Sequence, residues 1–228
     1  LSLSHMENIA ALQEFLKTPR NIVITTHQKP DGDAMGSSLA LYNYLQPLGH
    51  EVRVISPTEF PAYFGYLPGC DEVWNYLENP SLSQIAIESA ELIFCLDFND
   101  LGRIEPLNEF IKKNETAKLV LIDHHLNPQI DAEWILHDTK ACSTCELVYR
   151  LYEILEPAYV PTKEVSECIY TGILTDTASF SNGATSKKAL EITAHLLDCG
   201  LNIIYVQEQL NQNGREEKLR FIGNALSR

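Results

Sequence analysis

Side chains that can bind a metal or move a proton gather in four short stretches of this sequence. The first is His27-Gln-Lys-Pro-Asp31-Gly-Asp33, which follows the β-rich segment 21–26 and precedes a helical pattern. An imidazole and two carboxylates this close together suit a divalent ion such as manganese, iron or zinc. The other interpretation of the two aspartates is a polar turn that caps the next helix, since aspartate is a favoured cap.

Asp97 is the second candidate, and it lies at the end of the apolar segment 92–98. A carboxylate at the end of a buried strand is costly unless a partner neutralises it. A metal ion would be one such partner. The alternatives are a cap at the strand exit or a structural ion pair involving Asp100 and Arg103, which follow closely.

Asp123-His124-His125 and Asp176 complete the set. The triplet ends the apolar run KLVLI, and Asp176 follows the apolar stretch IYTGILT. Adjacent residues at a strand exit point in different directions, so one histidine can ligate a metal while the other faces a substrate. The alternative for Asp176 is a polar residue at a helix end or turn. Three other histidines lack neighbouring ligands and are expected on the surface or in the core: His50, His137 and His195.

Short apolar strands alternate with amphipathic helices up to about residue 138, and the rest of the chain has helical periodicity. This alternation predicts an α/β fold with a mostly parallel sheet of about five strands, helices on both faces and a helical C-terminal part. The expected strands are 21–26, 51–56, 71–76, 92–98 and 118–125, with an edge strand at 134–138. The expected helices are 34–47, 81–90, 105–113, 144–155, 162–174, 187–198, 202–212 and 215–227.

The four stretches should meet, because the carboxyl ends of parallel strands share one edge of the sheet, where α/β proteins bind ligands. Together they bring five aspartates and three histidines. Such a set can hold two metals through a shared carboxylate, and two metals can activate a water and stabilise a phosphoryl displacement. The sequence has no G-x-S-x-G, Walker A or G-x-G-x-x-G motif that would indicate another chemistry.

The chain of 228 residues carries a formal net charge of −14. Proteins that bind long nucleic acids use basic surfaces, so this composition argues against that class. No run of about 18 apolar residues could span a membrane, and the first residues do not resemble a signal peptide. We therefore expect a cytoplasmic protein without a membrane partner. The tripeptide Ser4-His5-Met6 resembles a cloning remnant, so His5 is left out of the candidate site.

Six cysteines occur in the chain, and two of them form Cys142-Ser-Thr-Cys145. C-x-x-C spacing near a helix start is compatible with a redox pair. Serine and threonine are also helix-capping residues, so the other interpretation is a capped helix with buried small side chains. A structural zinc site is not expected, because no second cysteine pair provides the remaining ligands.

The order H-x-x-x-D-x-D, a strand-end aspartate, D-H-H and a final aspartate in G-x-x-x-D-T resembles the DHH phosphoesterase family. The resemblance covers roughly residues 8–212, with all four motifs in the same order. The family includes RecJ-type exonucleases, family II inorganic pyrophosphatases, oligoribonucleotide and phosphoadenosine phosphatases, and cyclic-dinucleotide phosphodiesterases. It implies a Rossmann-like domain with two manganese ions, other divalent metals being allowed.

The family pattern, carried over position by position, implies a role for each metal-ligand candidate. The first metal would be held by His27 and Asp31, the second by Asp33, His124 and Asp176, with Asp97 bridging both. A water activated by the two cations would attack the phosphorus.

Three further residues have implied catalytic roles. Asp123 would orient a ligand histidine, and His125 would sit near the substrate phosphate. Arg103 matches a position where the oligonucleotide-phosphatase branch often has an arginine, so it would clamp a phosphate. A surface ion pair is the alternative for that arginine.

The resemblance implies a manganese-dependent phosphoesterase that hydrolyses phosphodiester or phosphomonoester bonds. Its substrates would be short single-stranded oligoribonucleotides or small nucleotides such as pAp and cyclic dinucleotides. The loop 61–69 resembles the F-x-x-L-P-G region of the oligonucleotide branch, and a place in the core explains its aromatic residues equally well.

Family members usually carry a second, C-terminal domain with a glycine-rich motif, and no G-G-G-H-like segment occurs here. We therefore expect 8–212 to be the catalytic DHH domain and 213–228 to begin a linker helix to a C-terminal domain. Residues 1–7 are expected to be a tag remnant or a disordered start. The alternative function is a non-catalytic metal- or nucleotide-binding module, inactive without the C-terminal domain. The oligomeric state is left open, with a homodimer among the options.

Overall fold

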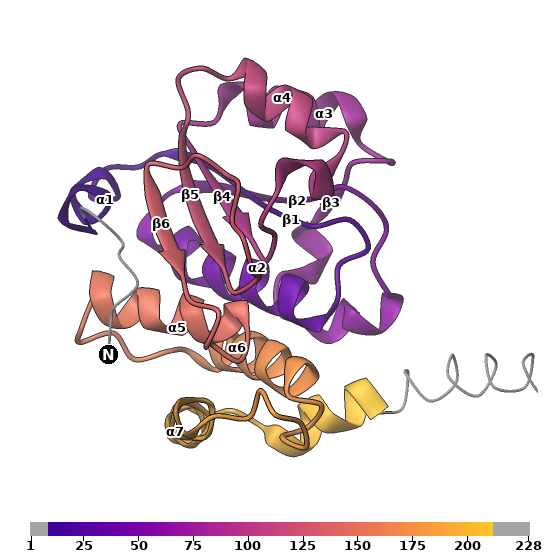
Figure 1. The fold of residues 1–228 in the computed structure, drawn as a ribbon, viewed down its shortest axis with the longest axis vertical. Helices are drawn as coiled ribbons and strands as arrows, with labels where there is room; N and C mark the ends of the chain where they lie inside the picture. Colours follow the sequence, from indigo (N-terminus) through magenta and orange to yellow (C-terminus); the bar gives the residue numbers. More distant parts are fainter. Residues whose placement is uncertain (1–8, 212–228) are drawn as a thin grey trace, which may run out of the picture.

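The computed structural model describes residues 9–211 and contains a six-stranded parallel sheet (Figure 1). The strands lie in the order β3-β2-β1-β4-β5-β6. The order reverses between β1 and β4, and sheets of this kind bind ligands outside the carboxyl ends of the strands at that reversal. The bounds are β1 Asn21–Thr26, β2 Glu51–Ser56, β3 Trp74–Asn75, β4 Leu92–Leu96, β5 Lys118–Asp123 and β6 Trp134–His137.

The expected α/β fold with helices on both faces is confirmed, and the sheet has six strands where about five were expected. The edge strand β3 lies within the expected strand 71–76 but is shorter, and it pairs with β2 only at Ile55↔Trp74 and Ser56↔Asn75. The first part of the expected strand is instead a 3-10 turn, Cys70–Glu72.

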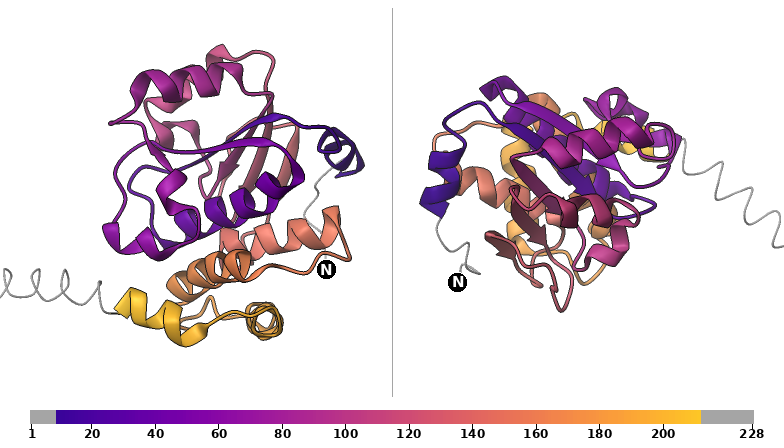
Figure 2. Two further views of the ribbon diagram at one scale, coloured as in Figure 1. Left: turned by 180° about the vertical axis from the view of Figure 1, so that it is seen from behind. Right: turned by 90° about the horizontal axis from the view of Figure 1, so that it is seen from above.

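Helices cover both faces of the sheet (Figures 1 and 2). Alternation along β1 explains the two layers, since successive side chains of a strand point to opposite faces. Ile22 and Ile24 enter the larger core beneath α2, α5 and α6, while Val23 enters the smaller core beneath α3 and α4. The bounds are α2 Gly32–Leu45, α5 Thr144–Leu155, α6 Lys163–Asp176, α3 Pro80–Ser89 and α4 Leu107–Lys113.

An outer layer of two helices lies beyond α6 (Figure 1). It consists of α7 (Lys187–Asp198) and a last helix, Ile203–Asn211. Within residues 9–211, no single helix is long and apolar enough to cross a membrane, although this bent pair together meets that length and composition.

Several helices differ from the expected ones. The helix expected at 105–113 begins only at Leu107, as α4, because Pro106 cannot continue a helix, and a separate 3-10 turn, Leu101–Ile104, precedes it. α6 extends to Asp176, so this aspartate lies in the last helical turn. α1 (Ile9–Phe15) was not expected. The elements expected within 1–7 and 213–228, including the helix 215–227, lie outside the described residues.

Candidate metal centre

The candidate residues meet at the carboxyl ends of β1, β4 and β5, beside the reversal of strand order. His27 directly follows β1, Asp97 directly follows β4, and Asp123 is the last residue of β5. Two helix ends complete the site, because Asp31 is the N-cap of α2 and Asp176 is the last residue of α6. Residues far apart in the sequence therefore share one edge of the sheet.

The first cluster consists of His27, Asp31 and Asp97, whose potential ligand atoms all lie within 4.8 Å of one another. His27 Nε2 is 3.5 Å from Asp97 Oδ2 and 4.0 Å from Asp31 Oδ1. The other ring nitrogen, Nδ1, lies 2.8 Å from the carbonyl oxygen of Gln28. A proton on Nδ1 would donate to that carbonyl, leaving Nε2 as a free acceptor that faces the two carboxylates.

The second cluster consists of Asp33, His124 and Asp176, again with potential ligand atoms within 4.8 Å of one another. His124 Nε2 lies 3.8 Å from Asp33 Oδ2 and 3.5 Å from Asp176 Oδ2. The same nitrogen is 3.5 Å from Asp97 Oδ1. Asp97 therefore directs one oxygen to each cluster.

The backbone of Asp97 is left-handed, with φ 66°. This conformation costs energy for a residue other than glycine and is found mainly where a site requires it. The side chain is almost completely buried, with 2% of its surface exposed. The backbone thus turns at the strand end and carries this carboxylate between the two clusters.

The site contains more negative than positive charge, and its pKa values reflect that. Burial and the neighbouring Asp97 and Asp176 carboxylates raise the pKa of Asp33 well above its usual range. Burial, followed by Asp97 and Asp31, raises the pKa of Asp176 to about 7. Carboxylates this crowded keep protons that divalent cations would displace, so both the donor types and the charge fit metal ions.

The pKa values of Asp97, His27 and His124 are shifted in the directions that favour ion pairs between them. Burial disfavours the charged form of Asp97, but His124 and His27 outweigh it and hold its pKa well below the usual range. Burial also opposes the charge on His124, yet the facing carboxylates raise its pKa to about 9. His27 has a raised pKa for the same reason. Metal ions in these positions would replace those protons.

Asp123 contacts His125 and not His124. Its Oδ1 lies 2.7 Å from His125 Nδ1, while its buried Oδ2 has no hydrogen-bond partner in the described part of the chain. The DHH resemblance implied that Asp123 orients a metal-ligand histidine. In the structure Asp123 instead contacts His125, the histidine expected to face the phosphate. His125 is the more exposed member of the pair, with 34% of its side chain accessible against 19% for His124.

His137 was set aside in the sequence, yet it supports this region. Its Nε2 lies 2.6 Å from the carbonyl oxygen of His125. The contact arises because His137 is aligned with Asp123 in the pairing of β5 and β6. Only that register reveals the role. His50, by contrast, is buried, with no hydrogen-bond partner among residues 9–211.

Arg103 lies beside the loop that carries His27. Its carbonyl oxygen accepts a hydrogen bond from the Gln28 amide at 2.9 Å. Asp100 directs its carboxylate to the Gly102 amide, and in the described range Arg103 forms no ion pair with any acidic side chain. Arg103 is partly exposed.

The start of α5 is the part of the site that the sequence did not reveal. Thr144 and Cys145 donate their backbone amides to the two oxygens of Asp33, at 2.6 and 2.9 Å. The two cysteines of Cys142-Ser-Thr-Cys145 are free and buried, and burial raises the pKa of each thiol. Ser143 caps the helix by accepting from the Glu146 amide. The capping interpretation therefore describes this segment, and raised thiol pKa values make a redox pair unreactive.

The aromatic loop 61–69 belongs to the core. Phe64 and Leu67 are buried, with 1% and 2% of their surfaces exposed. Tyr66 places its hydroxyl 2.8 Å from Thr171 Oγ1 on α6. The loop therefore contacts α6 through this hydrogen bond.

The fold and these clusters define a class. The sequence pattern of the DHH family, N-terminal domain, matches residues 21–173, and the chain belongs to this family. It is 30% identical over 227 residues to the bifunctional oligoribonuclease and PAP phosphatase NrnA of Thermus thermophilus, covering 98% of this chain and 64% of the relative. The NrnA protein of Bacillus subtilis is 31% identical over 179 residues, covering 77% of this chain and 52% of the relative.

A solved structure is also closely similar. An exopolyphosphatase-related protein from Bacteroides fragilis superimposes with a TM-score of 0.90 at 33% identity, covering 96% of this chain and 64% of that chain. A putative family II inorganic pyrophosphatase from Methanococcus jannaschii shares the fold, with a TM-score of 0.57 at 17% identity over 83% of this chain and 60% of that chain. The chain thus spans 52 to 64% of the length of the two NrnA relatives.

Proposed function

We propose that this chain is the catalytic part of a two-metal phosphoesterase. The observation that carries the proposal is the position of Asp97, whose Oδ2 faces His27 and whose Oδ1 faces His124. A carboxylate shared in this way is the arrangement that a pair of closely spaced cations requires. The relatives named NrnA, which are oligoribonucleases and PAP phosphatases, support hydrolysis of phosphate esters as the reaction.

The ligands divide between two positions. His27 and Asp31 would hold the first cation, Asp33, His124 and Asp176 the second, and Asp97 both. Imidazole and carboxylate donors suit manganese, which we propose as the metal. When bound, the two cations would supply a water activated for attack and would neutralise charge on the phosphoryl oxygens.

Residues outside the clusters would bind and orient the substrate. Asp123 holds His125 through a 2.7 Å contact at Nδ1, which leaves Nε2 to contact a phosphate or transfer a proton. Arg103 would hold a second phosphate oxygen, because its guanidinium has no ion-pair partner in the described range. We thus assign His125 and Arg103 to the substrate, and the buried Asp123 to the orientation of His125.

The substrates we propose are short single-stranded oligoribonucleotides or small nucleotides such as pAp. The net charge of −14 makes a long, salt-dependent nucleic-acid interface unfavourable. A cyclic dinucleotide is a close variant, since a cyclic-di-AMP phosphodiesterase, GdpP of Bacillus subtilis, is 23% identical over 210 residues. Each of these ligands presents only one or two phosphates to the site.

Hydrolysis of bis-p-nitrophenyl phosphate and of pApA, with and without manganese, tests the proposal. The comparison variant is Asp97→Ala with His124→Ala, and Thr193→Val on α7 is the matched control, because its hydroxyl bonds only within its own helix. Manganese-dependent turnover that the double variant loses and the control keeps is the expected result. Two manganese ions bound without turnover would favour the non-catalytic module, and neither binding nor turnover would overturn both.

A further inference from the structure

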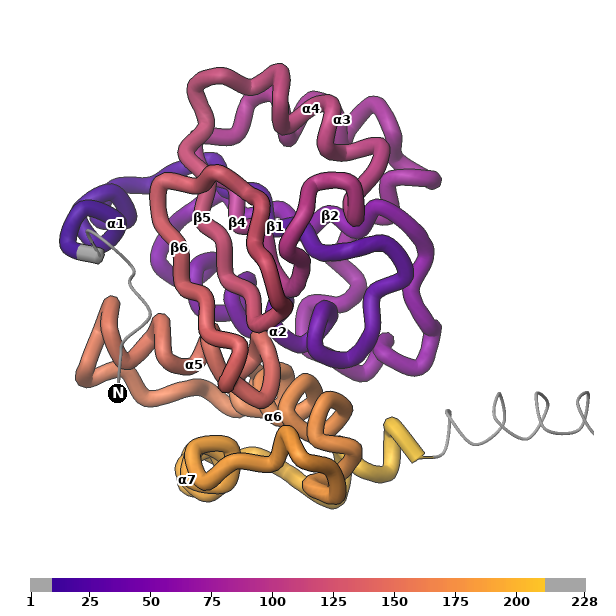
Figure 3. The backbone as a smooth tube through the Cα atoms, in the orientation of Figure 1, coloured from indigo at the N-terminus to yellow at the C-terminus, as the bar shows by residue number. Residues whose placement is uncertain are grey.

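The first turn of α5 reaches two of the metal-cluster carboxylates at once. Ser143 and Thr144 are completely buried, although both carry hydroxyl groups. Ser143 uses its hydroxyl as the helix cap. Thr144 has no such local task, and its hydroxyl instead donates to Asp97 Oδ1 at 2.9 Å. Figure 3 traces how the chain passes from β6 through the connection 138–143 into this helix.

Asp33 accepts hydrogen bonds from the backbone amides of the same turn. The amides of Thr144 and Cys145 donate to its Oδ2 and Oδ1, respectively. Short hydrogen bonds to an ionised carboxylate are about twice as strong as neutral ones. The positive end of a helix dipole adds to this effect. The helix start therefore favours the charged form of the fully buried Asp33 carboxylate and fixes the plane of its two oxygens.

The hydrogen bond from the Thr144 hydroxyl has a different role at Asp97. The oxygen that accepts from Thr144 is the one that faces His124, at 3.5 Å. The other oxygen faces His27. A donor on Oδ1 fixes the rotation of the carboxylate, so that one oxygen stays directed at each cluster. The left-handed backbone of Asp97 does not fix that rotation by itself.

Close packing of α6 keeps this turn in place. A Cβ atom on Gly172 would lie 2.3 Å from Cys145 Sγ and 2.6 Å from Asp33 Oδ1. Such distances do not occur between real atoms, so only glycine lets α6 approach this closely. The three helices that carry Asp33, Thr144 and Asp176 are therefore in contact around one carboxylate.

We propose that Thr144 is a positioning residue of the metal centre, with its hydroxyl setting the orientation of the bridging Asp97 and its amide that of Asp33. The inference rests on the two-metal site proposed above. Thr144 would not touch a cation or substrate itself. It would act through the carboxylates, as outer partners of metal ligands commonly do, and such partners typically change metal affinity or activity about 10- to 100-fold.

The test compares Thr144→Val, which keeps the branched shape but loses the hydroxyl, with Thr144→Ser, which restores it. Thr193→Val is the matched control, since Thr193 is a buried helix threonine whose hydroxyl bonds only to Ala189 O. Calorimetric titration with manganese measures both affinities. The electron paramagnetic resonance spectrum of the loaded protein measures the magnetic coupling of the two ions, which depends on the bridging carboxylate.

We expect Thr144→Val to bind the weaker manganese ion about 10- to 100-fold less tightly and to lose the spectrum of a coupled pair. The serine variant should recover both, and the control should match the unmodified protein. Thr144→Ala carries the same test if the valine variant does not fold. Unchanged affinity and spectrum in the valine or alanine variant would overturn the inference alone. An unmodified protein that binds no manganese would overturn the proposed function as well.

Discussion

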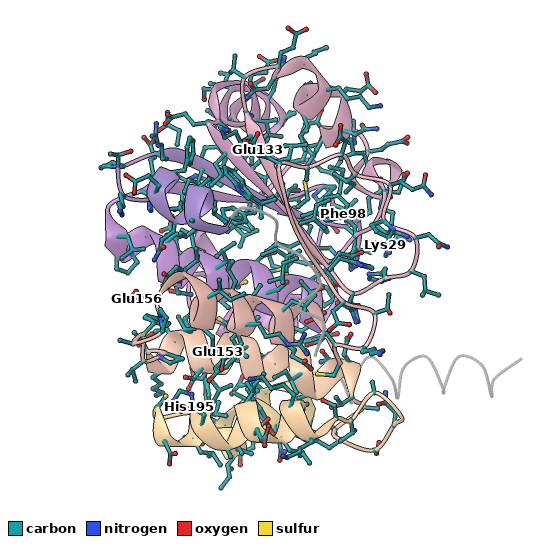
Figure 4. All side chains as sticks on the ribbon, turned by 60° about the vertical axis from the view of Figure 1, so that its left-hand side comes forward. Lys29, Phe98, Glu133, Glu153, Glu156 and His195 are labelled. Atoms are coloured by element: carbon teal, nitrogen blue, oxygen red, sulfur yellow. The ribbon has the colours of Figure 1, made fainter. Side chains whose placement is uncertain are left out.

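Two histidine clusters of this protein look alike in a list of residue types but differ in charge. In the metal centre, His124 faces three carboxylates. In the outer layer, His195 places Nδ1 2.7 Å from the Tyr149 hydroxyl and Nε2 3.7 Å from Cys199 Sγ. Figure 4 shows His195 well away from Lys29, which belongs to the loop between His27 and Asp31.

The two clusters differ in whether their charges and hydrogen-bonding groups are balanced within the protein. His195, Tyr149 and Cys199 contact one another without a carboxylate among them, so each ring nitrogen of His195 already has a partner. The carboxylates around His124 outnumber the cationic groups that face them, and the pKa values of two of them, Asp33 and Asp176, are raised. Uncompensated negative charge, and not the proximity of ligand-type residues alone, therefore distinguishes the candidate metal centre from the outer cluster.

Removing the bridging charge should have the largest effect. Asp97→Asn keeps the size of the side chain but removes the charge that both clusters share, so we expect hydrolysis to fall by more than the roughly 100-fold typical of changes outside the ligand shell. The measurement is kcat/KM for bis-p-nitrophenyl phosphate at saturating manganese. Activity within about tenfold of the unmodified protein, or 1.4 kcal/mol, would contradict the bridging role.

The pH dependence of metal-free stability comes next. The raised pKa of Asp176, about 7, means that the folded state binds more protons than the unfolded chain above pH 3.8, so stability falls as the pH rises through 7. The raised pKa of His124, about 9, adds stability below 6.5 that is lost as the pH rises through 9.

Thermal unfolding with a chelator, scanned from pH 5 to pH 9, measures this dependence. We expect Tm to decline over that range, and manganese to restore it most at the alkaline end, because cations replace the lost protons. A flat Tm profile without metal would show that the charges in the site are already compensated.

A smaller effect is expected at the helix contact. Gly172→Ala places a methyl group against Cys145 and Asp33, and overpacking of this kind typically costs about 1–3 kcal/mol. Chemical denaturation measures it. Gly183→Ala is the control, since a Cβ there meets no atom within 4 Å. Equal stability of the two variants would mean that α6 can move aside.

The smallest effect belongs to the outer cluster. Tyr149→Phe removes the hydroxyl that bonds to His195, and we expect a loss of about 1 kcal/mol in stability, with manganese affinity and hydrolysis unchanged. Calorimetry and the same phosphodiester assay measure these quantities. A change in metal affinity would show that the outer cluster is coupled to the metal centre after all.

The sequence predicted the parts of the site that follow apolar strands. Asp97 and Asp123 stand out because charge at the end of a buried strand is unusual, and the strand-helix alternation was enough to predict that the strand ends meet. Thr144 could not be found this way, since its contact with Asp33 spans 111 positions and depends on helix packing. The role of His137 depends on strand register, which periodicity does not reveal.

The two clusters are completed at different points along the chain. The first contains only residues up to Asp97, which directly follow β1 and β4 or cap the start of α2. The second requires Asp176, at the far end of α6. During synthesis, where segments near the N-terminus emerge and fold first, a ribosome-bound chain would assemble the first position before α6 exists. Occupation of the second position would then report that the C-terminal helices have docked.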